Sequence, residues 1–258
     1  MCYEEFCNQY NFNSPFTLYY GILSRLKKLN LLYNPEYITI NLPFYPKFLE
    51  IIRKSSKGSK DFYNIFINQI WRKPKHEMKW EKEFNLEVDS NWWKTKNSLI
   101  FKVTNDIQIR WFQYRIMRRI LATNTFLCKI GITDSELCTF CNEYPETLNH
   151  LFWECEYTSE IWEEIHEWIK ELSGIDIYMN KMDIVIGKQY KCCNTLNLLI
   201  CLVKKHIYRK RCLNQIPSFQ GAKYEILYYY ECEKYIYRKN CEMDKFEKRW
   251  NCLSLDAL

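Results

Sequence analysis

Residues 138–155 read CTFCNEYPETLNHLFWEC, so three cysteines and one histidine follow the spacing Cys-x2-Cys-x8-His-x4-Cys. Zinc takes four thiolate or imidazole ligands in a tetrahedron, and a gap of two residues lets one tight turn present two thiolates to one ion. This pattern predicts a Zn²⁺ site made of Cys138, Cys141, His150 and Cys155. Four protein ligands leave no position open for water, so we expect a structural ion and not a hydrolytic one.

Other interpretations of this stretch remain open. The four side chains could be unliganded core residues, although this spacing seldom arises by chance. A redox Cys-x-x-Cys would need a βαβ context, which the sequence lacks. For Phe140, Phe152 and Trp153, packing against a neighbouring helix is favoured over stacking on nucleic-acid bases, because the knuckle contains acids and no Lys or Arg.

Outside the knuckle, the composition predicts helices. Of the 258 residues, 47% are hydrophobic, which is enough for a buried core, but only 6 are Gly and 7 are Pro. Sandwiches and barrels need many tight turns, so this scarcity favours helices joined by short links. The predicted fold class is mostly α, a helical array with an inserted Cys-Cys-His-Cys zinc knuckle.

Apolar residues that recur every three or four positions place the helices along the chain. We expect helices at 14–29, 60–71, 76–84, from 90, 106–121, 158–173, 194–214 and 218–250, with a linker at 36–47 and a loop at 55–60. Ser90 and either Thr158 or Ser159 are expected to act as N-caps. The helix at 106–121 is predicted from the stripe Ile107, Trp111, Tyr114, Met117 and Leu121.

The charges are strongly segregated, although the net charge is only +6. No acid lies between Asp106 and Asp134 or between Asp183 and Glu225, whereas ten acids and no base lie between Lys129 and Lys170. Basic helices are candidates for phosphate contacts, and a solvated surface is the alternative interpretation. The candidate nucleic-acid residues are Arg110, Arg115, Arg118, Arg119, Lys129, Lys204, Lys205, Arg209, Lys210 and Arg211. Arg115, Arg118 and Arg119 are expected on one helical face.

Several function classes are disfavoured by what the sequence lacks. It has no signal peptide and no apolar run of membrane-spanning length, so we expect an intracellular protein of the cytoplasm or nucleus, with most of its 13 cysteines reduced. It has no glycine-rich phosphate loop, no Gly-x-Ser-x-Gly and no Asp-Asp or Asp-x-Asp pair for two magnesium ions. The chain is therefore expected not to be an enzyme.

Residues 109–168 resemble the reverse-transcriptase zinc-binding region near the carboxy terminus of LINE-type (non-LTR) retrotransposon polyproteins. The resemblance rests on the arginine helix running into LATNTFL (121–127), on IGI (130–132), on ETLNHLFWEC (146–155) and on the following Trp162. It continues in SPFTLYYG (14–21), KKHIYRKRCL (204–213), PSF (217–219), 231–237 and FEKRW (246–250). It divides the chain into a helical upstream region (1–103), a zinc-binding domain (104–174, knuckle 138–155) and a carboxy-terminal helical region (175–258).

The resemblance implies the tail of a protein that copies its own RNA at a nicked chromosomal target, and this tail is thought to help bind the RNA template. The endonuclease and the polymerase aspartates of such proteins are absent here, so those activities do not transfer. We expect a zinc-binding module that contacts RNA, target DNA or both through its basic helices, with the polymerase domain of the same element as a possible partner. The alternative is a structural module that docks onto a polymerase or a host protein.

Overall fold

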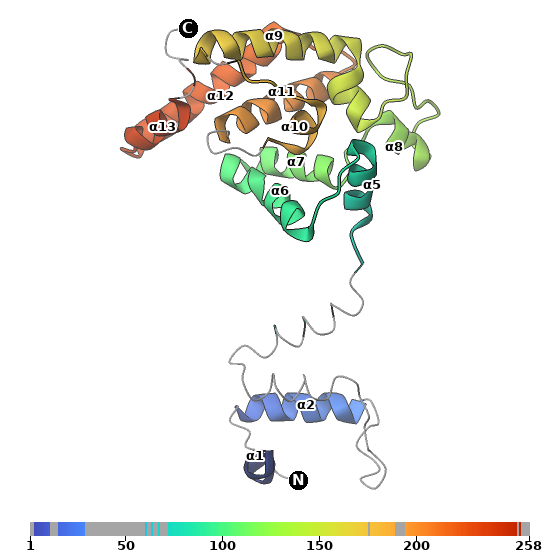
Figure 1. Ribbon diagram of the computed structural model, residues 1–258, viewed down its shortest axis with the longest axis vertical. Coiled ribbons are helices and arrows are strands. Elements are labelled where there is room, and N and C mark those ends of the chain that lie inside the picture. The colour runs from blue at the N-terminus through green and yellow to red at the C-terminus, as the bar shows by residue number, and fades with distance from the viewer. Residues whose placement is uncertain are drawn as a thin grey trace. The chain divides into compact units, whose positions relative to one another are not determined.

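The computed structural model describes residues 3–10, 15–28, 60, 63, 67, 72–174, 176–188, 194–251 and 253. They belong to two compact units, Met1–Lys73 and Pro74–Leu258 (Figure 1). The described residues are mostly helical and include no strand, only an isolated bridge between Leu137 and Pro145. The predicted fold class is therefore confirmed. Both domain boundaries predicted from the sequence, after residues 103 and 174, fall inside the second unit.

The first unit contains helices α1 (Tyr3–Tyr10) and α2 (Phe16–Lys28). They pack around buried Tyr19, whose ring lies 5.5 Å from Tyr3 and 5.2 Å from Phe6 between ring centroids. Helix α2 confirms the helix predicted at 14–29. The linker predicted at 36–47 lies outside the described residues, as does most of the predicted loop at 55–60 and of the predicted helix at 60–71.

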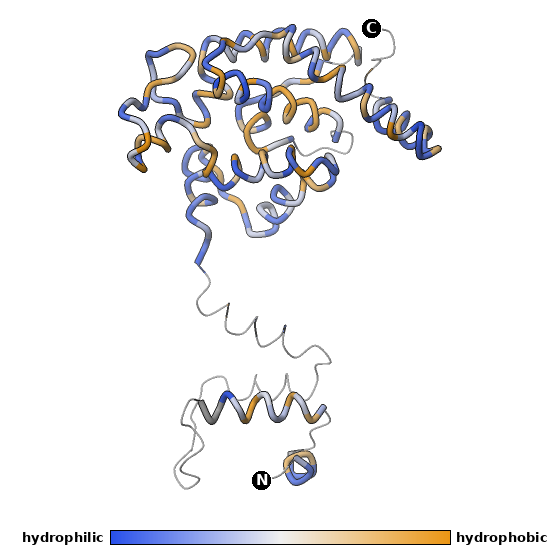
Figure 2. The backbone as a smooth tube through the Cα atoms, turned by 180° about the vertical axis from the view of Figure 1, so that it is seen from behind, coloured by the Kyte–Doolittle hydropathy of each residue, from blue (hydrophilic) through white to orange (hydrophobic). Residues whose placement is uncertain are grey.

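The second unit is a helical array built around one central helix. Helix α11 (Asn194–Cys212) packs against α6 (Ser90–Val103), α7 (Ile107–Met117), α12 (Phe219–Lys239) and α13 (Met243–Trp250). Its first turns are buried on every side, so Leu198, Leu199 and Val203 are all inaccessible. Figure 2 shows the same pattern, with apolar colour gathered towards the middle of this unit. Burial all round is what an apolar helix needs in a polar environment.

The other helices cover this core. Helix α9 (Glu156–Ser173) packs against α12 and against the π-helix η1 (His150–Glu154). Helix α10 (Lys181–Ile186) packs against α7 and η1, while α5 (Lys75–Phe84) and α8 (Asn124–Lys129) complete the unit. The buried face of α9 carries the predicted residues Ile161, Trp162, Ile165, Trp168 and Ile169.

Several predicted helix ends are wrong. Asp89 and not Ser90 caps α6, because its carboxylate accepts a hydrogen bond from the Trp92 amide. Cys155 precedes α9, whose first turn already contains Thr158, so neither Thr158 nor Ser159 is its cap. The predicted helix 218–250 is broken by left-handed Cys241 (φ 56°), which separates α12 from α13.

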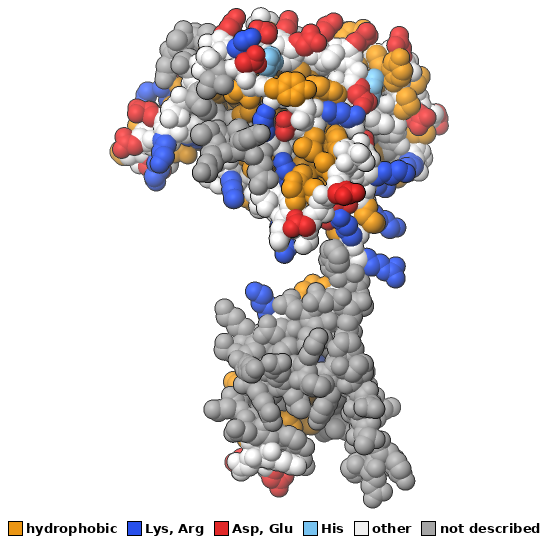
Figure 3. Space-filling model, viewed as in Figure 1, with side chains coloured by type: hydrophobic (Ala, Val, Ile, Leu, Met, Phe, Trp, Pro, Cys, Tyr) orange, Lys and Arg blue, Asp and Glu red, His pale blue; other side chains and the backbone are white. Residues whose placement is uncertain are grey.

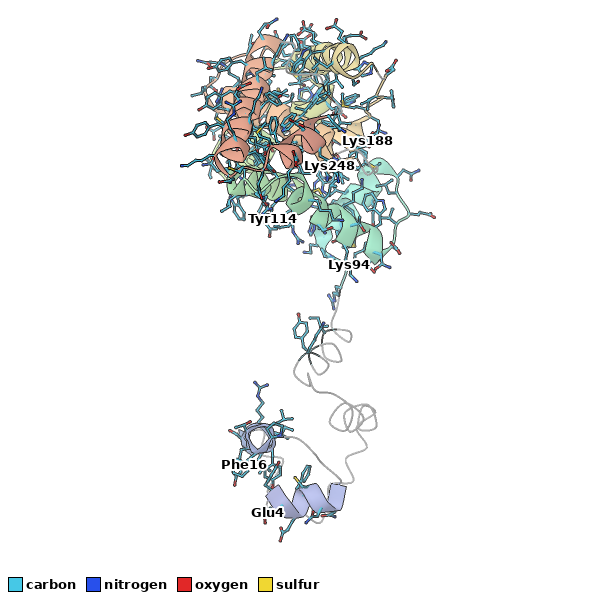
Figure 4. All side chains as sticks on the ribbon, turned by 90° about the vertical axis from the view of Figure 1, so that its left-hand side faces the viewer. Glu4, Phe16, Lys94, Tyr114, Lys188 and Lys248 are labelled. Atoms are coloured by element: carbon cyan, nitrogen blue, oxygen red, sulfur yellow. The ribbon has the colours of Figure 1, made fainter. Side chains whose placement is uncertain are left out.

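Helix α7 corrects two predictions at once. Its period is right, and Met117 of the predicted stripe is buried, but the rest of its buried face consists of Ile109, Phe112, Gln113 and Ile116. Three residues of the predicted stripe, Ile107, Trp111 and Tyr114, face solvent; Figure 4 labels Tyr114 on α7 at the edge of the unit. The helix also ends at Met117, so Arg118 and Arg119 do not continue the face of Arg115.

Two lysines lie inside the second unit. Lys204 is 1% exposed, and its Nζ donates to Gln113 Oε1 at 2.7 Å and to the Val185 carbonyl at 3.2 Å. Lys96 Nζ donates to the Gly187 carbonyl at 2.6 Å. Both therefore bind carbonyl groups at the C-terminal end of α10, where a positive charge is favourable. Burial nevertheless lowers the pKa of Lys204 to about 8.

Within the described ranges, no helix has the length and apolarity that crossing a membrane requires.

Candidate zinc centre and basic cleft

The four predicted zinc ligands meet in one place. One ligand atom from each of Cys138, Cys141, His150 and Cys155 lies within 4.8 Å of the others. The Sγ atoms of Cys138 and Cys155 are 3.9 Å apart, and Cys141 Sγ lies 3.3 Å from His150 Nε2. A tetrahedral site with Zn–S bonds of about 2.3 Å places two sulfurs roughly 3.8 Å apart. The donor set and its spacing therefore fit Zn²⁺.

A tight turn holds the first two ligands. The Asn142 amide donates to the Cys138 carbonyl at 2.9 Å, and Asn142 takes a left-handed conformation (φ 56°) that asparagine tolerates better than most residues. The Phe140 amide points at Cys138 Sγ at 3.4 Å, and the Cys138 amide donates to the Tyr144 carbonyl at 2.8 Å. The turn thus presents both thiols to the same side, as the two-residue gap predicted.

A single turn of π-helix holds the other two ligands. In η1 the Cys155 amide donates to the His150 carbonyl at 2.9 Å, a bond between residues i and i+5. In an α-helix, residues five apart point in different directions, so the wider turn lets His150 and Cys155 face one point. The Thr147 hydroxyl accepts from the His150 amide at 3.0 Å and fixes the start of this turn.

The thiols of Cys138 and Cys155 are electrostatically coupled. The hydrogen bond between the two sulfurs lowers the pKa of the Cys138 thiol well below its usual range and raises the pKa of the Cys155 thiol. Two thiolates this close repel each other in a buried site, so only one forms readily unless a cation balances them. A bound Zn²⁺ would supply that positive charge and hold both sulfurs deprotonated.

Glu146 is the residue that organises the knuckle, and the sequence did not reveal it. Its carboxylate is fully buried and accepts from the Asn124 amide at 2.8 Å, from the Thr139 amide at 2.9 Å and from the Thr139 hydroxyl at 2.7 Å. Arg211 Nε on α11 also donates to it at 2.9 Å. Glu146 therefore joins the cysteine turn to α8 and to the central helix. Its arginine partner lies 65 residues away, so no local pattern could indicate the pair.

The aromatic residues of the knuckle pack inward. Phe140 and Phe152 are buried in the main core, where the Phe152 ring lies edge-on to Phe112 at 6.2 Å. The Trp162 indole on α9 donates to the Phe152 carbonyl at 2.6 Å. The packing interpretation of Phe140 and Phe152 is therefore confirmed, and half-buried Trp153 lies against the same core.

Four of the predicted nucleic-acid residues interact with other residues of the protein. Arg110 donates to the carbonyls of Thr104 and Phe101, and Arg211 to Glu146. Arg118 contacts His76 Nε2 at 2.9 Å. Arg119 pairs with Glu83 and lies 4.0 Å from the centre of the Trp80 ring. These cations tie neighbouring segments together.

The remaining predicted residues differ in accessibility. The Lys204 ammonium is buried and cannot contact a phosphate, so the prediction of Lys204 as a nucleic-acid residue is wrong. Lys129 is exposed at the end of α8, and Lys210 donates to Gln215 Oε1 at 2.9 Å.

The last three, Arg115, Lys205 and Arg209, line one cleft of about 400 Å³ between α7 and α11. The structure thus joins the two acid-free segments, which lie far apart in the sequence. Exposed Trp111 and half-buried Tyr208 line the cleft as well. Its one carboxylate among the described lining residues is Glu225, which pairs with Arg209 and His206.

The acids of the sequence gather elsewhere. The exposed side of α9 carries six glutamates: Glu156, Glu160, Glu163, Glu164, Glu167 and Glu171. In Figure 3, acidic side chains line the upper edge of the second unit, where Figure 1 places α9. A polyanion would be repelled from this edge, so the cleft and not α9 is the candidate nucleic-acid surface.

Residues 58–162 match the model of a family described as zinc-binding in reverse transcriptase. The match contains all four candidate zinc ligands and Arg115, while Lys205 and Arg209 lie beyond it. No curated protein matches the chain.

Proposed function

We propose that this chain, which contains a zinc-binding region of the reverse-transcriptase kind, is a nucleic-acid-binding module from the carboxy-terminal part of a LINE-type reverse transcriptase. Zn²⁺ is its structural cofactor. RNA template or target DNA is its ligand, and the module has no polymerase or endonuclease activity of its own. The LINE assignment rests on the sequence segments that resemble such proteins on both sides of the matched region.

The observation that carries this proposal is the cleft between α7 and α11. Arg115 comes from one acid-free segment, Lys205 and Arg209 from the other, and all three line the same hollow. The Arg115 Nε atom is buried and has no hydrogen-bond partner among the described residues. Clustered cations of this kind attract phosphates, and binding releases counterions from the nucleic acid.

The zinc knuckle is joined to the helix that carries two of the cleft cations. Arg211, which donates to the buried Glu146 carboxylate of the knuckle, follows Arg209 by two residues on α11. Cys138 and Cys141 would hold the ion, and Glu146 accepts a hydrogen bond from Thr139 in the turn between them. Through its bond to Glu146, Arg211 joins this turn to the basic end of α11. The knuckle therefore acts by positioning, and the cations touch the ligand.

The test is RNA affinity measured by fluorescence anisotropy over a series of salt concentrations. Replacing Arg115, Lys205 and Arg209 together by Ala should weaken binding and reduce the slope of log K against log salt by about 2, since each single-strand phosphate contact contributes about 0.7. The matched control replaces Lys239, Lys245 and Lys248 by Ala, which removes the same charge from exposed sites at the end of α12 and on α13. Equal losses in both variants would reject the cleft, and no affinity at low salt would reject the function.

Exposed apolar residues beside the knuckle favour a second candidate function, docking onto a polymerase domain. Ile130, Ile132, Leu137 and Tyr144 are all exposed. If this surface docks, an Ile132→Asp variant loses association with a reverse-transcriptase polymerase domain supplied as a separate chain, while its RNA affinity stays unchanged. Association that survives the substitution excludes docking through Ile132.

A further inference from the structure

Exposed aromatic rings flank the cations of the cleft. Trp111, 55% exposed, lines the cleft beside Arg115. A second hollow of about 790 Å³ adjoins the first, because Lys205, Arg209 and Glu225 line both. This second hollow adds Tyr224 and Tyr228 of α12, which are 69% and 63% exposed. Lys205 and Arg209 thus lie between the hollow that contains Trp111 and the hollow that contains Tyr224 and Tyr228.

The rings are held in position. Trp111 stacks on Tyr114 with centroids 5.2 Å apart and planes 12° from parallel, and both residues belong to α7. Tyr224 and Tyr228 stack at 6.4 Å and 19° along α12. Residues three or four apart are neighbours on a helix surface, so the two rings of each pair lie side by side and pack against each other. Large apolar side chains exposed in this way have no role in the core.

From this arrangement we infer that the cleft takes single-stranded nucleic acid, with unpaired bases stacking on Trp111 and on the Tyr224–Tyr228 pair while Lys205 and Arg209 hold the phosphates. The inference rests on the proposed function and names the ligand class of the same site. In a duplex the faces of the bases are covered by their neighbours, so exposed rings gain nothing from it. In a single strand every base offers a face, and each base–aromatic stack contributes to binding in a sequence-tolerant way.

The charges limit where the strand lies. Glu225 sits between the two hollows, but its carboxylate is shared by Arg209 and His206. Further along the second hollow come Asp106, Glu233 and Glu242, which make that end unfavourable for phosphates although Arg249 pairs with Glu233. The phosphates of the nucleic-acid strand should therefore lie at the end that holds Lys205 and Arg209. Tyr224 and Tyr228 lie at the edge of this region.

The experiment compares three probes on the full zinc-loaded chain: oligouridine RNA, oligothymidine DNA, and a duplex, each about 12 nucleotides long to cover one binding site. Fluorescence anisotropy at a fixed salt concentration gives the affinities. Both single strands should bind more tightly than the duplex. Trp111→Ala should reduce single-strand affinity roughly 10-fold or more, as expected for the loss of one stack, with the salt slope unchanged.

The controls separate this inference from the proposed function. Trp111→Phe keeps a ring and should retain most of the affinity, whereas the Tyr224→Ala, Tyr228→Ala double variant should lose it. Tyr178→Ala, at an exposed tyrosine that lines neither hollow, should have no effect. Equal affinity for duplex and single strands, with no effect of the ring variants, overturns the inference and leaves the proposed function standing. Absence of binding to every probe at low salt overturns both.

Discussion

The zinc knuckle (138–155) and the helical body around α11 are stabilised by different interactions. In the body, side chains such as Leu198, Leu199 and Val203 are fully covered by other helices. In the knuckle, by contrast, the four residues 142–145 are all exposed. Phe140 and Phe152, on either side of these four residues, reach the main core. The body is thus held by apolar burial, whereas the exposed turn at 142–145 is held by polar bonds and would also be held by a bound Zn²⁺.

Removing the ion should separate the two regions most clearly. Structural zinc contributes on the order of 10 kcal/mol or more to folding, so chelation or Cys141→Ser should unfold residues 138–149. Hydrogen exchange followed by mass spectrometry should show lost protection there and retained protection in α11. A Cys212→Ser variant, at an exposed cysteine outside the cluster, provides the control. If α11 loses protection in the same step, the two regions are one cooperative unit and the comparison fails.

The second largest effect is expected at the joint between the regions. Glu146→Ala leaves the Arg211 guanidinium and the Thr139 and Asn124 amides without their acceptor. Breaking a buried ion pair by removing one partner costs about 3 to 5 kcal/mol, which urea unfolding can measure. Glu146→Gln keeps one acceptor oxygen and should cost less. Equal losses for Ala and Gln would mean that shape, and not hydrogen bonding, is what Glu146 supplies.

The same contrast explains what the sequence could predict. The cluster of the four candidate zinc ligands was predictable because their spacing is local: one turn supplies two and one π-turn the other two. The partners of Glu146 were not, because Arg211 reaches it from a helix 65 residues later. Likewise, the run of bases at 204–211 does not tell that Lys204 points inward while Lys205 lines the cleft.

Helix α7 shows a second limit of sequence reasoning. Periodicity predicted a helix after Asp106, and its carboxylate does cap the helix by accepting from the Gln108 and Ile109 amides. Periodicity did not predict which face is buried, since both faces of α7 carry apolar residues and the packing of α11 decides between them. Nor did it predict the end at Met117, where Arg119 adopts a left-handed conformation (φ 57°) without a glycine to mark the turn.

Two adjacent lysines, Lys204 and Lys205, compare the loss of a cation in the helical body with the loss of a cation in the cleft. Lys204→Ala removes a buried stem and the donor to Gln113, which should cost about 2 to 4 kcal/mol of unfolding free energy. Lys205→Ala should change stability by less than about 0.5 kcal/mol and instead weaken nucleic-acid binding. The two variants differ by one position along α11 and should give opposite results in unfolding and in anisotropy. Loss of binding with Lys204→Ala in a protein of unchanged stability would contradict this division.

The smallest effect concerns the contact between α5 and the end of α7. Burial and the nearby Arg118 lower the pKa of His76 from its usual 6.5 to about 4, so the folded protein keeps this imidazole neutral, with Glu77 3.9 Å away. Below pH 6.5 the unfolded chain takes up a proton that the folded chain refuses, so the contribution to stability falls as the pH drops towards 4. Comparing the pH dependence of unfolding with that of His76→Gln isolates this contribution, because glutamine accepts a hydrogen bond from Arg118 at any pH. Any zinc ligation that is lost in acid would be lost in both proteins, so only their difference reports on His76. A difference that stays constant from pH 7 to about pH 4 would mean that His76 titrates alike in the folded and unfolded chains.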